Sequence, residues 1–402
     1  KYPLWHANLA ARRALRRGVP AGLSGTPRYN VHANDIDFQI EADFIGLMTP
    51  GLPRLANDIA MRAGRVMNYG DGIAGGMFVA CMYSAAFFEK DPRRVVEEGL
   101  ACLPPKSPYA ALIRDVLAWR RQYPEDWKKN WAEIEKKWNR REPCPAGALR
   151  PFNIDAKING AYIALGLLYG DADMAKTIRI STQAGQDSDC NPSSAAGILG
   201  VMLGWSGIPE EWKAGIPAIA DKKFAFTDFS FESIVESTYR RALKAVAREG
   251  GAVTDREVRV PVQKAKPARL PLWDDYGSPA ERISYRDPRW KFTGAWSEEG
   301  KLRSQVSGEK GAAAEIEFEG TGFIVVGPYL PDGGFAEVWL DGKRVNNVDV
   351  YPDEKSVKGE ESVFHQFGLK RGRHTVRLVV LGVRHTDSSG ARVAIGELVV
   401  FR

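Results

Sequence analysis

The stretch of this sequence best suited to chemistry is AGQDSDCNPSSAAGILGVMLG, which runs from Ala184 to Gly204. Asp187 and Asp189 lie two residues apart, and the small and apolar residues behind them have helical spacing. A turn that supplies two carboxylates, directly followed by a closely packed helix, can hold a hard cation such as Mg²⁺. The alternative is structural, with Asp187 as a helix cap and Asp189 as a first-turn carboxylate favoured by the helix dipole. The spacing alone leaves both interpretations open.

A second group of acids lies in HANDIDFQIEADFIGLMTPGLP. Asn34 or Asp35 is placed to cap a helix whose apolar positions recur at helical spacing, namely Ile36, Ile40, Phe44 and Leu47. Glu41 lies one turn after Asp37, so these two acids share a face of that helix. More acids surround the helix start than capping requires, which makes Asp35, Asp37 and Glu41 candidates for general acid or base. The alternative is a capped and solvated first turn.

The third candidate region is the loop from Asn68 to Gly72, which leads into another helix rich in small residues. Its glycines allow a ligand to approach the backbone closely. Asp71 in this loop joins the candidates for general acid or base. The residues expected to contact the substrate are Asn34, Asn68, Tyr69, Gly70 and Asn191.

The elements that must position these residues change in kind along the chain. Helical patterns continue to an amphipathic helix that ends at Gly250 and Gly251, and residues 252–272 then lose periodicity, as is typical of a linker. Residues 273–402 form short alternating runs separated by Gly and Asp turns, which predicts an antiparallel β-sandwich of about eight strands. We therefore expect a multidomain α and β protein with an all-α domain over 1–251 and a jelly-roll sandwich over 273–402.

Composition narrows the possible partners. With 44% hydrophobic and 26% charged residues, the 402-residue chain is typical of globular proteins. The net charge is +6, but the basic residues are scattered, so we expect no nucleic-acid partner. There is no apolar run of the length that crosses a membrane.

The cysteines and histidines give weaker signals. The four cysteines have no C-x-x-C spacing, which disfavours a zinc site. Cys81 is interpreted as a small core residue, and Cys190 as a residue that lines the site without acting as a nucleophile. His6 and His32 are interpreted as surface or packing residues. In the second domain Trp290, Trp296 and Tyr329 are possible sugar-stacking platforms, with a place in the core or at the domain interface as the preferred interpretation.

G-Q-D-S-D-C followed by a small-residue helix resembles the G-x-D-[ST]-D-[TCN] signature of the ADP-ribosylglycohydrolases, and the resemblance extends over roughly residues 1–250. It implies an all-helical domain in whose centre Asp187 and Asp189 bind a pair of Mg²⁺ ions. The patterns Y-G-D-G and I-D-F-Q-I-E-A-D-F resemble a bacterial branch of the family associated with carbohydrate breakdown. Asn68 and Tyr69 stand where the family often has a Thr-His pair, which argues against protein-linked ADP-ribose as the substrate.

Two further expectations follow from this resemblance. The family carries an earlier metal motif, a Gly-Asp segment and an Asp-Asp pair, that has no match here. Either the chain is a fragment that lacks part of its catalytic domain, which we favour, or Asn34, Asp35 and Asp37 take over that role. The sandwich resembles the galactose-binding-like, carbohydrate-binding jelly rolls of glycoside hydrolases, and no ligand residue is assigned in it.

Together these features predict a metal-dependent glycoside hydrolase that cleaves a sugar or ADP-ribosyl substrate with Mg²⁺-activated water. The alternative is a non-catalytic carbohydrate-binding protein with a degenerate metal site. A role in carbohydrate breakdown favours the periplasm or the exterior of a bacterium over the cytoplasm.

Overall fold

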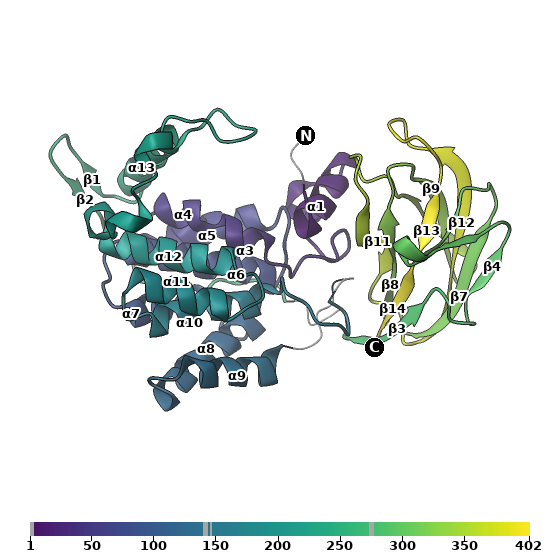
Figure 1. Ribbon diagram of the computed structural model, residues 1–402, viewed down its shortest axis with the longest axis horizontal. Coiled ribbons are helices and arrows are strands. Elements are labelled where there is room, and N and C mark those ends of the chain that lie inside the picture. Colours follow the sequence, from purple (N-terminus) through teal and green to yellow (C-terminus); the bar gives the residue numbers. More distant parts are fainter. Residues whose placement is uncertain (1–3, 140–143, 145–146, 273–276) are drawn as a thin grey trace. The chain divides into compact units, whose positions relative to one another are not determined.

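The computed structural model in Figure 1 describes residues 4–139, 144, 147–272 and 277–402. The chain folds into two compact units. Among the described residues, the helical unit comprises 4–139 and 153–272, and the β unit comprises 144, 147–152 and 277–402. Each unit has a hydrophobic core of its own. The expected fold class, an all-helical domain followed by an antiparallel sandwich, is confirmed.

The described part of the helical unit contains thirteen α-helices. They are α1 (His6–Arg16), α2 (Ala21–Ser24), α3 (Asp37–Glu41), α4 (Asp43–Leu47), α5 (Pro53–Gly64), α6 (Asp71–Ala86), α7 (Pro92–Cys102), α8 (Pro108–Gln122), α9 (Trp127–Trp138), α10 (Ala156–Tyr169), α11 (Met174–Gln183), α12 (Cys190–Leu203) and α13 (Phe231–Arg248). Short 3₁₀ turns follow α12 at Trp205–Gly207, Glu210–Trp212 and Pro217–Ile219.

Helices α6 and α10 form the centre of the helical unit. Every residue of α10 and all but one of α6 are buried, as expected for helices that are apolar or small on all sides. Glycines let neighbouring side chains lie directly on these helices: a Cβ at Gly160 would lie 1.6 Å from the Tyr109 hydroxyl, and one at Gly76 would lie 2.2 Å from the Phe38 ring. Because both helices run through the core, the polar residues at their starts are buried as well.

A disulfide joins α6 to the end of α7. Cys81 is fully buried, as predicted, but it is bonded to Cys102 and is not a simple core thiol. Cys144 and Cys190 are thiols outside this disulfide.

The helix predicted after Asn34 differs from the observed one. Two short helices, α3 and α4, meet at Ala42, and α3 begins at Asp37 without a side-chain cap from Asn34 or Asp35. The predicted apolar face is wrong, because Ile40 and Phe44 are 37% and 45% exposed. The break at Ala42 shifts the helical phase, and the residues that enter the core are Phe38, Ala42 and Ile45.

The stretch predicted as a linker packs along α5. Gln263 donates its backbone N–H to the Gly51 carbonyl (2.8 Å), and Arg54 donates through Nε to the Lys264 carbonyl (2.9 Å). The stretch starts with the two-stranded β1 (Ala252–Val253) and β2 (Val258–Arg259). Residues 252–272 are therefore part of the helical unit rather than a free connection.

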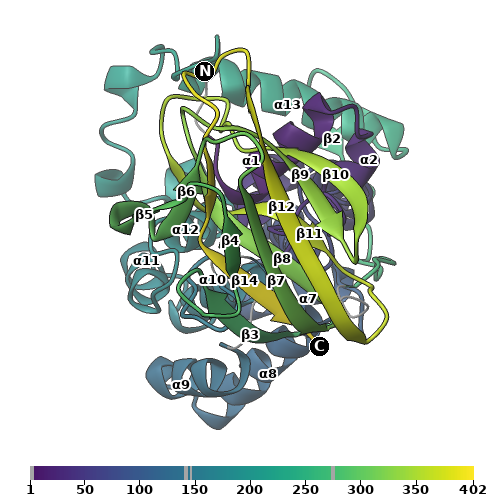
Figure 2. The same cartoon turned by 90° about the vertical axis from the view of Figure 1, so that its right-hand side faces the viewer.

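The β unit contains twelve strands in its described residues, more than the predicted eight, and all pair antiparallel within three sheets. The sheet orders are β10-β9-β12-β7-β4, β11-β8-β14-β3 and β13-β6-β5 (Figure 2). The strands are β3 (Pro279–Ser284), β4 (Lys291–Thr293), β5 (Ser297–Glu299), β6 (Ser304–Ser307), β7 (Ala313–Gly320), β8 (Gly322–Tyr329), β9 (Gly334–Leu340), β10 (Lys343–Asp349), β11 (Lys358–Gln366), β12 (Gly372–Arg384), β13 (Val393–Ile395) and β14 (Glu397–Phe401), with a 3₁₀ turn at Gly300–Leu302.

A segment between α9 and α10 belongs to the β unit, although the sequence placed it in the helical domain. Arg150 pairs with Glu360 (2.9 Å) and with Glu397. Arg282 also binds Glu397 and donates to the Ala148 carbonyl (2.8 Å). Local periodicity carries no signal for ion pairs between residues this far apart in the chain.

Trp290 and Tyr329 lie in the core of the β unit, as preferred from the sequence, and Trp296 packs against it. Within the described residues, no helix is both long and apolar enough to cross a membrane.

Candidate active site and metal centre

The polar centre of the helical unit is built from the starts of α3, α6, α10 and α12. Asp37 begins α3, Asp71 begins α6 and Asp155 caps α10. These three carboxylates are all buried. Helix α12 begins just after Asp187 and Asp189. The partial positive charge at helix N-termini favours anions, so four helices stabilise acids in this region.

Backbone contacts connect these helix starts. Asp35 forms an isolated antiparallel bridge with Asp155. The hydrogen bonds around this bridge run from Ile36 N to Ile154 O (2.9 Å), from Ala156 N to Asn34 O (3.2 Å) and from Tyr69 N to Ala33 O (2.9 Å). The loop that carries Asp35 is thereby held against the starts of both α10 and α6.

Asn68 positions this loop. Its amide group donates to the carbonyls of Ala33 and Asp35, both at 2.8 Å, and its Oδ1 accepts from Phe38 N at 3.1 Å. The side chain is fully buried and its hydrogen bonds all go to backbone. The geometry therefore gives Asn68 a structural task, and its contact with substrate stays a prediction.

The glycines of this loop serve the same close packing. Gly70 has φ +52°, a left-handed conformation that L side chains rarely adopt. A Cβ at Gly72 would lie 2.2 Å from the Ala33 carbonyl oxygen. Tyr69, which the sequence places at the substrate, is half-buried beside Gly70.

Asn159 is a second positioning residue, for which the sequence predicted no role. Its Oδ1 accepts from Asp187 N (3.1 Å) and from Asn191 Nδ2 (2.8 Å). Its Nδ2 donates to the carbonyls of Asn153 (3.1 Å) and Asp155 (2.8 Å). One buried amide thus ties the Asp187 turn to the start of α10. An asparagine inside an otherwise apolar helix is the sequence signal that could have found it.

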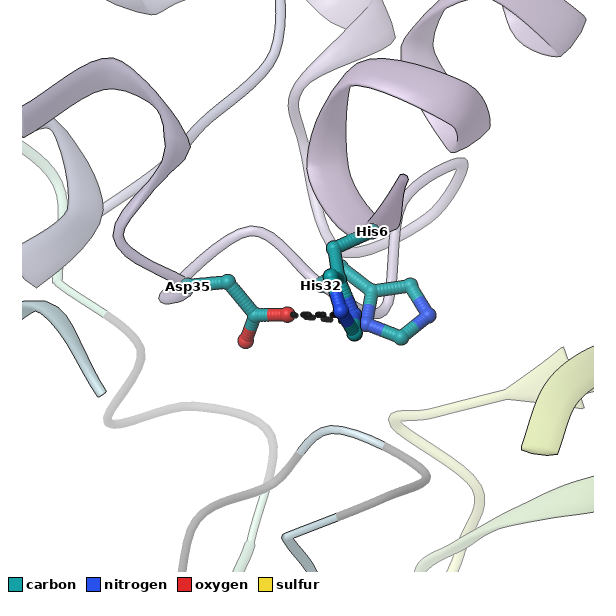
Figure 3. A group of neighbouring side chains, drawn as sticks. All are labelled: His6, His32 and Asp35. Atoms are coloured by element: carbon teal, nitrogen blue, oxygen red, sulfur yellow. Dashed lines mark hydrogen bonds and ion pairs between the residues drawn. The ribbon is translucent and has the colours of Figure 1, made fainter. Parts of the chain in front are cut away.

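Figure 3 shows a cluster of His6, His32 and Asp35. Asp35 Oδ2 lies 2.9 Å from His32 Nδ1 and 3.6 Å from His6 Nδ1. The two rings meet edge to face with their centroids 5.3 Å apart. His32 is buried and His6 is partly exposed, which agrees with their interpretation as packing or surface residues, but the sequence did not predict that both contact Asp35. Two imidazole nitrogens and a carboxylate this close together are also a donor set for a first-row transition metal.

Asp37 and Glu41 share one partner, Asn8. Its backbone N–H donates to Asp37 Oδ1 (3.0 Å) and its amide to Glu41 Oε1 (2.7 Å). Burial raises the pKa of Asp37 to about 7, the charge of Asp35 adds to the rise, and the Asn8 bond and His32 oppose it. Burial also raises the pKa of Glu41. A carboxyl that titrates near neutral pH is suited to general acid or base chemistry.

Asp71 lies beside Tyr109 at the start of α8. Asp71 Oδ1 accepts from Tyr109 N (3.3 Å), and the Tyr109 hydroxyl bonds to Gln39 (2.7 Å). Burial raises the pKa of Tyr109 well above its ordinary value, and the charges of Asp71 and Asp155 add to the effect. Asp155 in turn pairs with the buried Lys157. The phenol therefore lies within the field of both acids and stays neutral.

The Asp187 turn combines features of a cap and of a ligand group. Asp187 Oδ1 accepts from Cys190 N at 3.2 Å, a capping bond, whereas Asp189 makes none. Burial, together with the neighbouring Asp189, raises the pKa of Asp187, and the bond from Asp187 lowers that of Asp189. Asp187, Asp189 and Cys190 offer ligand atoms within 4.8 Å of one another. Burial and the adjacent Asp187 raise the pKa of the Cys190 thiol to about 12, which favours its protonated form.

Four buried oxygens in this region have no hydrogen-bond partner among the described residues. They are Asn34 Oδ1, Asp35 Oδ1, Gln186 Oε1 and Asn191 Oδ1. Leaving such an acceptor unsatisfied costs about 1–3 kcal/mol, which a bound cation, water or substrate hydroxyl would offset. Carboxylate and amide oxygens are the ligands that Mg²⁺ prefers, so the donor set fits that ion.

Comparison with known proteins identifies the family of the helical part of the chain. Residues 2–250 match the family model described as ADP-ribosylglycohydrolase. In Flavonifractor plautii, an A type blood N-acetyl-alpha-D-galactosamine deacetylase is 32% identical over 146 residues, which are 34% of this chain and 17% of that protein. An A type blood alpha-D-galactosamine galactosaminidase from the same organism is 31% identical over 104 residues, which are 25% of this chain and 9% of that protein.

This chain thus spans less than a fifth of either relative's length. Among solved structures, it is similar to the CBM36-1 domain of a multidomain xylanase from the hindgut metagenome of Trinervitermes trinervoides. The TM-score is 0.22 with 11% identity, over 29% of this chain and 93% of that domain. Because the matched family model covers more than half of the residues, the chain belongs to the ADP-ribosylglycohydrolase family.

Proposed function

We propose that this chain is a metal-dependent glycoside hydrolase that cleaves a glycosidic bond of a sugar or ADP-ribosyl substrate. The observation that carries the proposal is that three buried acids, Asp37, Asp71 and Asp155, lie at the starts of α3, α6 and α10. The half-buried Asp187 and the exposed Asp189 directly precede α12. Buried carboxylates are costly unless they are paired or bound to a cation.

Asp187 and Asp189 would hold Mg²⁺, as a binuclear site where further oxygens join, and Asn191 Oδ1 and Asp35 Oδ1 are unpartnered oxygens that could join them. A bound Mg²⁺ would supply an acidified water and neutralise negative charge. The cluster of His6, His32 and Asp35 suits a softer first-row ion, so Mn²⁺ and Zn²⁺ are the competing metals to test.

The chain's own residues would divide the remaining tasks. Asp37 can hold or release a proton near neutral pH, which suits it to act on the leaving group or on the attacking water. His32 orients Asp35 through their 2.9 Å contact. Glu41 and Asp71 remain further candidates for the acid or base, and Asn34, Tyr69, Gly70 and Asn191 for substrate contact.

A sugar is the favoured substrate over an ADP-ribosyl group. The names of the two relatives refer to galactosamine-containing sugars of A type blood. Asn68 and Tyr69 occupy the position at which the family often has a Thr-His pair. The amide group of Asn68 donates its hydrogen bonds to backbone carbonyls. The first substrates to test are therefore α-galactosaminides, followed by other glycosides and ADP-ribosyl compounds.

A periplasmic or extracellular location is supported by the bond between Cys81 and Cys102, since disulfides persist in oxidising compartments. Of the four cysteines, we expect two to react with a thiol reagent in the denatured, unreduced protein and four after reduction. Four reactive thiols before reduction would remove this support.

Calorimetric titration with Mg²⁺, compared between the parent chain and an Asp187→Ala, Asp189→Ala double variant, tests the metal site. We expect binding that the double variant abolishes. Asp173→Ala is a matched control because Asp173 caps the exposed start of α11 and lies outside the cluster. Equal binding by all three proteins would contradict the assignment of these ligands.

Hydrolysis of the substrate panel, with and without metal, tests the reaction. Metal-dependent turnover that is lost in the double variant supports the hydrolase. The competing function, a carbohydrate-binding protein with a degenerate metal site, would show retention of glycans with no turnover and no dependence on metal.

A further inference from the structure

The five-stranded sheet of the β unit has a solvent face that the core does not use. Along β9, the side chains of Ala336, Val338 and Leu340 are buried in the core, while Glu337 and Trp339 alternate with them and are half-buried. Strands β7 and β12 lie in the same sheet, with β12 between β7 and β9 (Figure 2), and show the same alternation.

A hollow of about 420 Å³ lies over these strands, within the range of about 300–1,000 Å³ typical of ligand sites. The lining residues that matter for recognition are Glu315, Glu337, Trp339, Gly342, Thr375 and Arg377. All of them belong to β7, β9 and β12 or to the turn that follows β9, so rigid strands hold most of the lining.

Trp339 is the aromatic member of this group. It lies opposite Arg377 on β12 and opposite Arg344 on β10, and its Nε1 donates to Glu337 Oε2 at 3.3 Å. It is absent from the hydrophobic core of the β unit. A large indole on a polar sheet face offers a flat apolar surface beside hydrogen-bonding groups, the combination that suits the C–H face of a sugar ring.

The charged groups around Trp339 balance each other. Glu315 lies 4.0 Å from Arg377, and Glu337 lies 3.3 Å from Arg344. Glu315, Glu337 and Arg377 line the hollow itself, and Arg344 lies beside it and pairs with Glu337. With Arg344 included, the formal charges of the two carboxylates and two guanidinium groups cancel, and the groups supply several donors and acceptors. Such a site has no net charge with which to select a phosphate or a cation, and it suits a ligand that is uncharged and rich in hydroxyl groups.

We propose that this hollow binds a neutral saccharide, with a sugar ring on Trp339 and its hydroxyls hydrogen-bonded to Glu337, Arg377 and their neighbours. The site would retain glycans independently of the chemistry in the helical unit. Trp339 lies in GFAEVWLDGK, where alternation alone predicts a strand but does not show that the outward residues form a hollow.

The test uses the full chain on an array of neutral oligosaccharides built from hexoses, pentoses and N-acetylhexosamines, followed by titration with the best binder. We expect Trp339→Ala to weaken binding roughly tenfold or more, which corresponds to the loss of about 1.4 kcal/mol of stacking. Trp339→Phe, which keeps an aromatic face, should restore part of the affinity. Trp212→Ala is the matched control, since Trp212 is exposed in the helical unit, and it should bind as the parent does.

Two further variants keep the result interpretable. If Trp339→Ala fails to fold, judged by its melting temperature, Glu337→Gln and Arg377→Met remove hydrogen bonds without removing the indole, and each should lower affinity. The Asp187→Ala, Asp189→Ala variant should bind glycans as the parent does. Loss of the proposed hydrolase activity can therefore be distinguished from loss of glycan binding at the hollow. No binding to any neutral glycan, or unchanged affinity in all three variants of the hollow, would overturn it.

Discussion

Asp37 shows how a single buried carboxyl can make the stability of the helical unit depend on pH. Burial is the main reason that its pKa rises from 3.8 to about 7, and the negative charges of Asp35 and Glu41 raise it further. The hydrogen bond from Asn8 and the nearby His32 act in the other direction and lower this pKa. Between these two pH values the unfolded chain loses the proton and the folded chain keeps it. The folded state therefore becomes less stable as pH rises through this window, by an upper value of roughly 4 kcal/mol above pH 7.

Asp37→Asn should remove this dependence. Below about pH 4 the variant and the parent should differ little in their pH trend, and the variant should gain stability relative to the parent as pH rises toward 7. Urea unfolding in the presence of EDTA at several pH values measures the difference, with the exposed Asp173→Asn as the control. A constant difference across the window would show that the Asp37 pKa is not raised.

Asn159 should control metal affinity although it is not a proposed ligand. It orients the backbone of Asp187 and the amide of Asn191. Asn159→Ala should weaken Mg²⁺ binding by about 10–100-fold, the usual cost of removing a residue that orients ligands. Calorimetric titration measures it, with Asn57→Ala as the control, because Asn57 is another buried amide that donates to two carbonyls. Equal losses in both variants would indicate general destabilisation instead.

At the scale of elements, the small residues of α12 determine how closely it approaches α6. A Cβ at Gly197 would lie 1.9 Å from the Tyr83 hydroxyl, whereas one at Gly200 would lie 3.4 Å from Ile208, an ordinary contact. Gly197→Ala should destabilise the protein by about 1–3 kcal/mol through overpacking. Gly200→Ala should be neutral or stabilising by up to about 1 kcal/mol, since alanine favours the helix. Thermal unfolding of the two variants measures this difference, and equal melting temperatures would contradict the tight α6–α12 contact.

At the same scale, the sequence predicted the elements better than their contacts. The apolar, small-residue helices and the alternating strands have distinct periods, so the fold class could be predicted. The break between α3 and α4 at Ala42 could not be predicted, because acidic residues continue through both short helices and the sequence pattern is that of one longer helix. Asp187 and Asp189 could be proposed as metal ligands because they are close together in sequence, whereas the contact of His6 with Asp35 depends on a loop path that no spacing encodes.

For the whole molecule, the same limit applies over longer distances. Arg150 pairs with Glu397 across most of the chain, so residues that precede α10 in sequence belong to the β unit. Four cysteines allow several pairings, and only the packing of α6 against α7 selects Cys81 and Cys102. Trp339 lies on an ordinary strand, and its hollow arises from three strands that are distant in sequence. Both proposed sites therefore depend on tertiary contacts that the local pattern does not contain.

The two separate cores predict that ligands stabilise the two units independently. The helical unit and the β unit each have a hydrophobic cluster of their own, so calorimetric unfolding of the full chain should show two transitions. Gly197→Ala should lower one transition and Val338→Ala, which truncates a fully buried residue of the β unit, should lower the other. Mg²⁺ at a hundred times its dissociation constant should then stabilise only the first, by about 2.7 kcal/mol, and a bound saccharide only the second. A single transition that both variants and both ligands shift would show that the units unfold as one, and that the metal and glycan sites share one folding equilibrium.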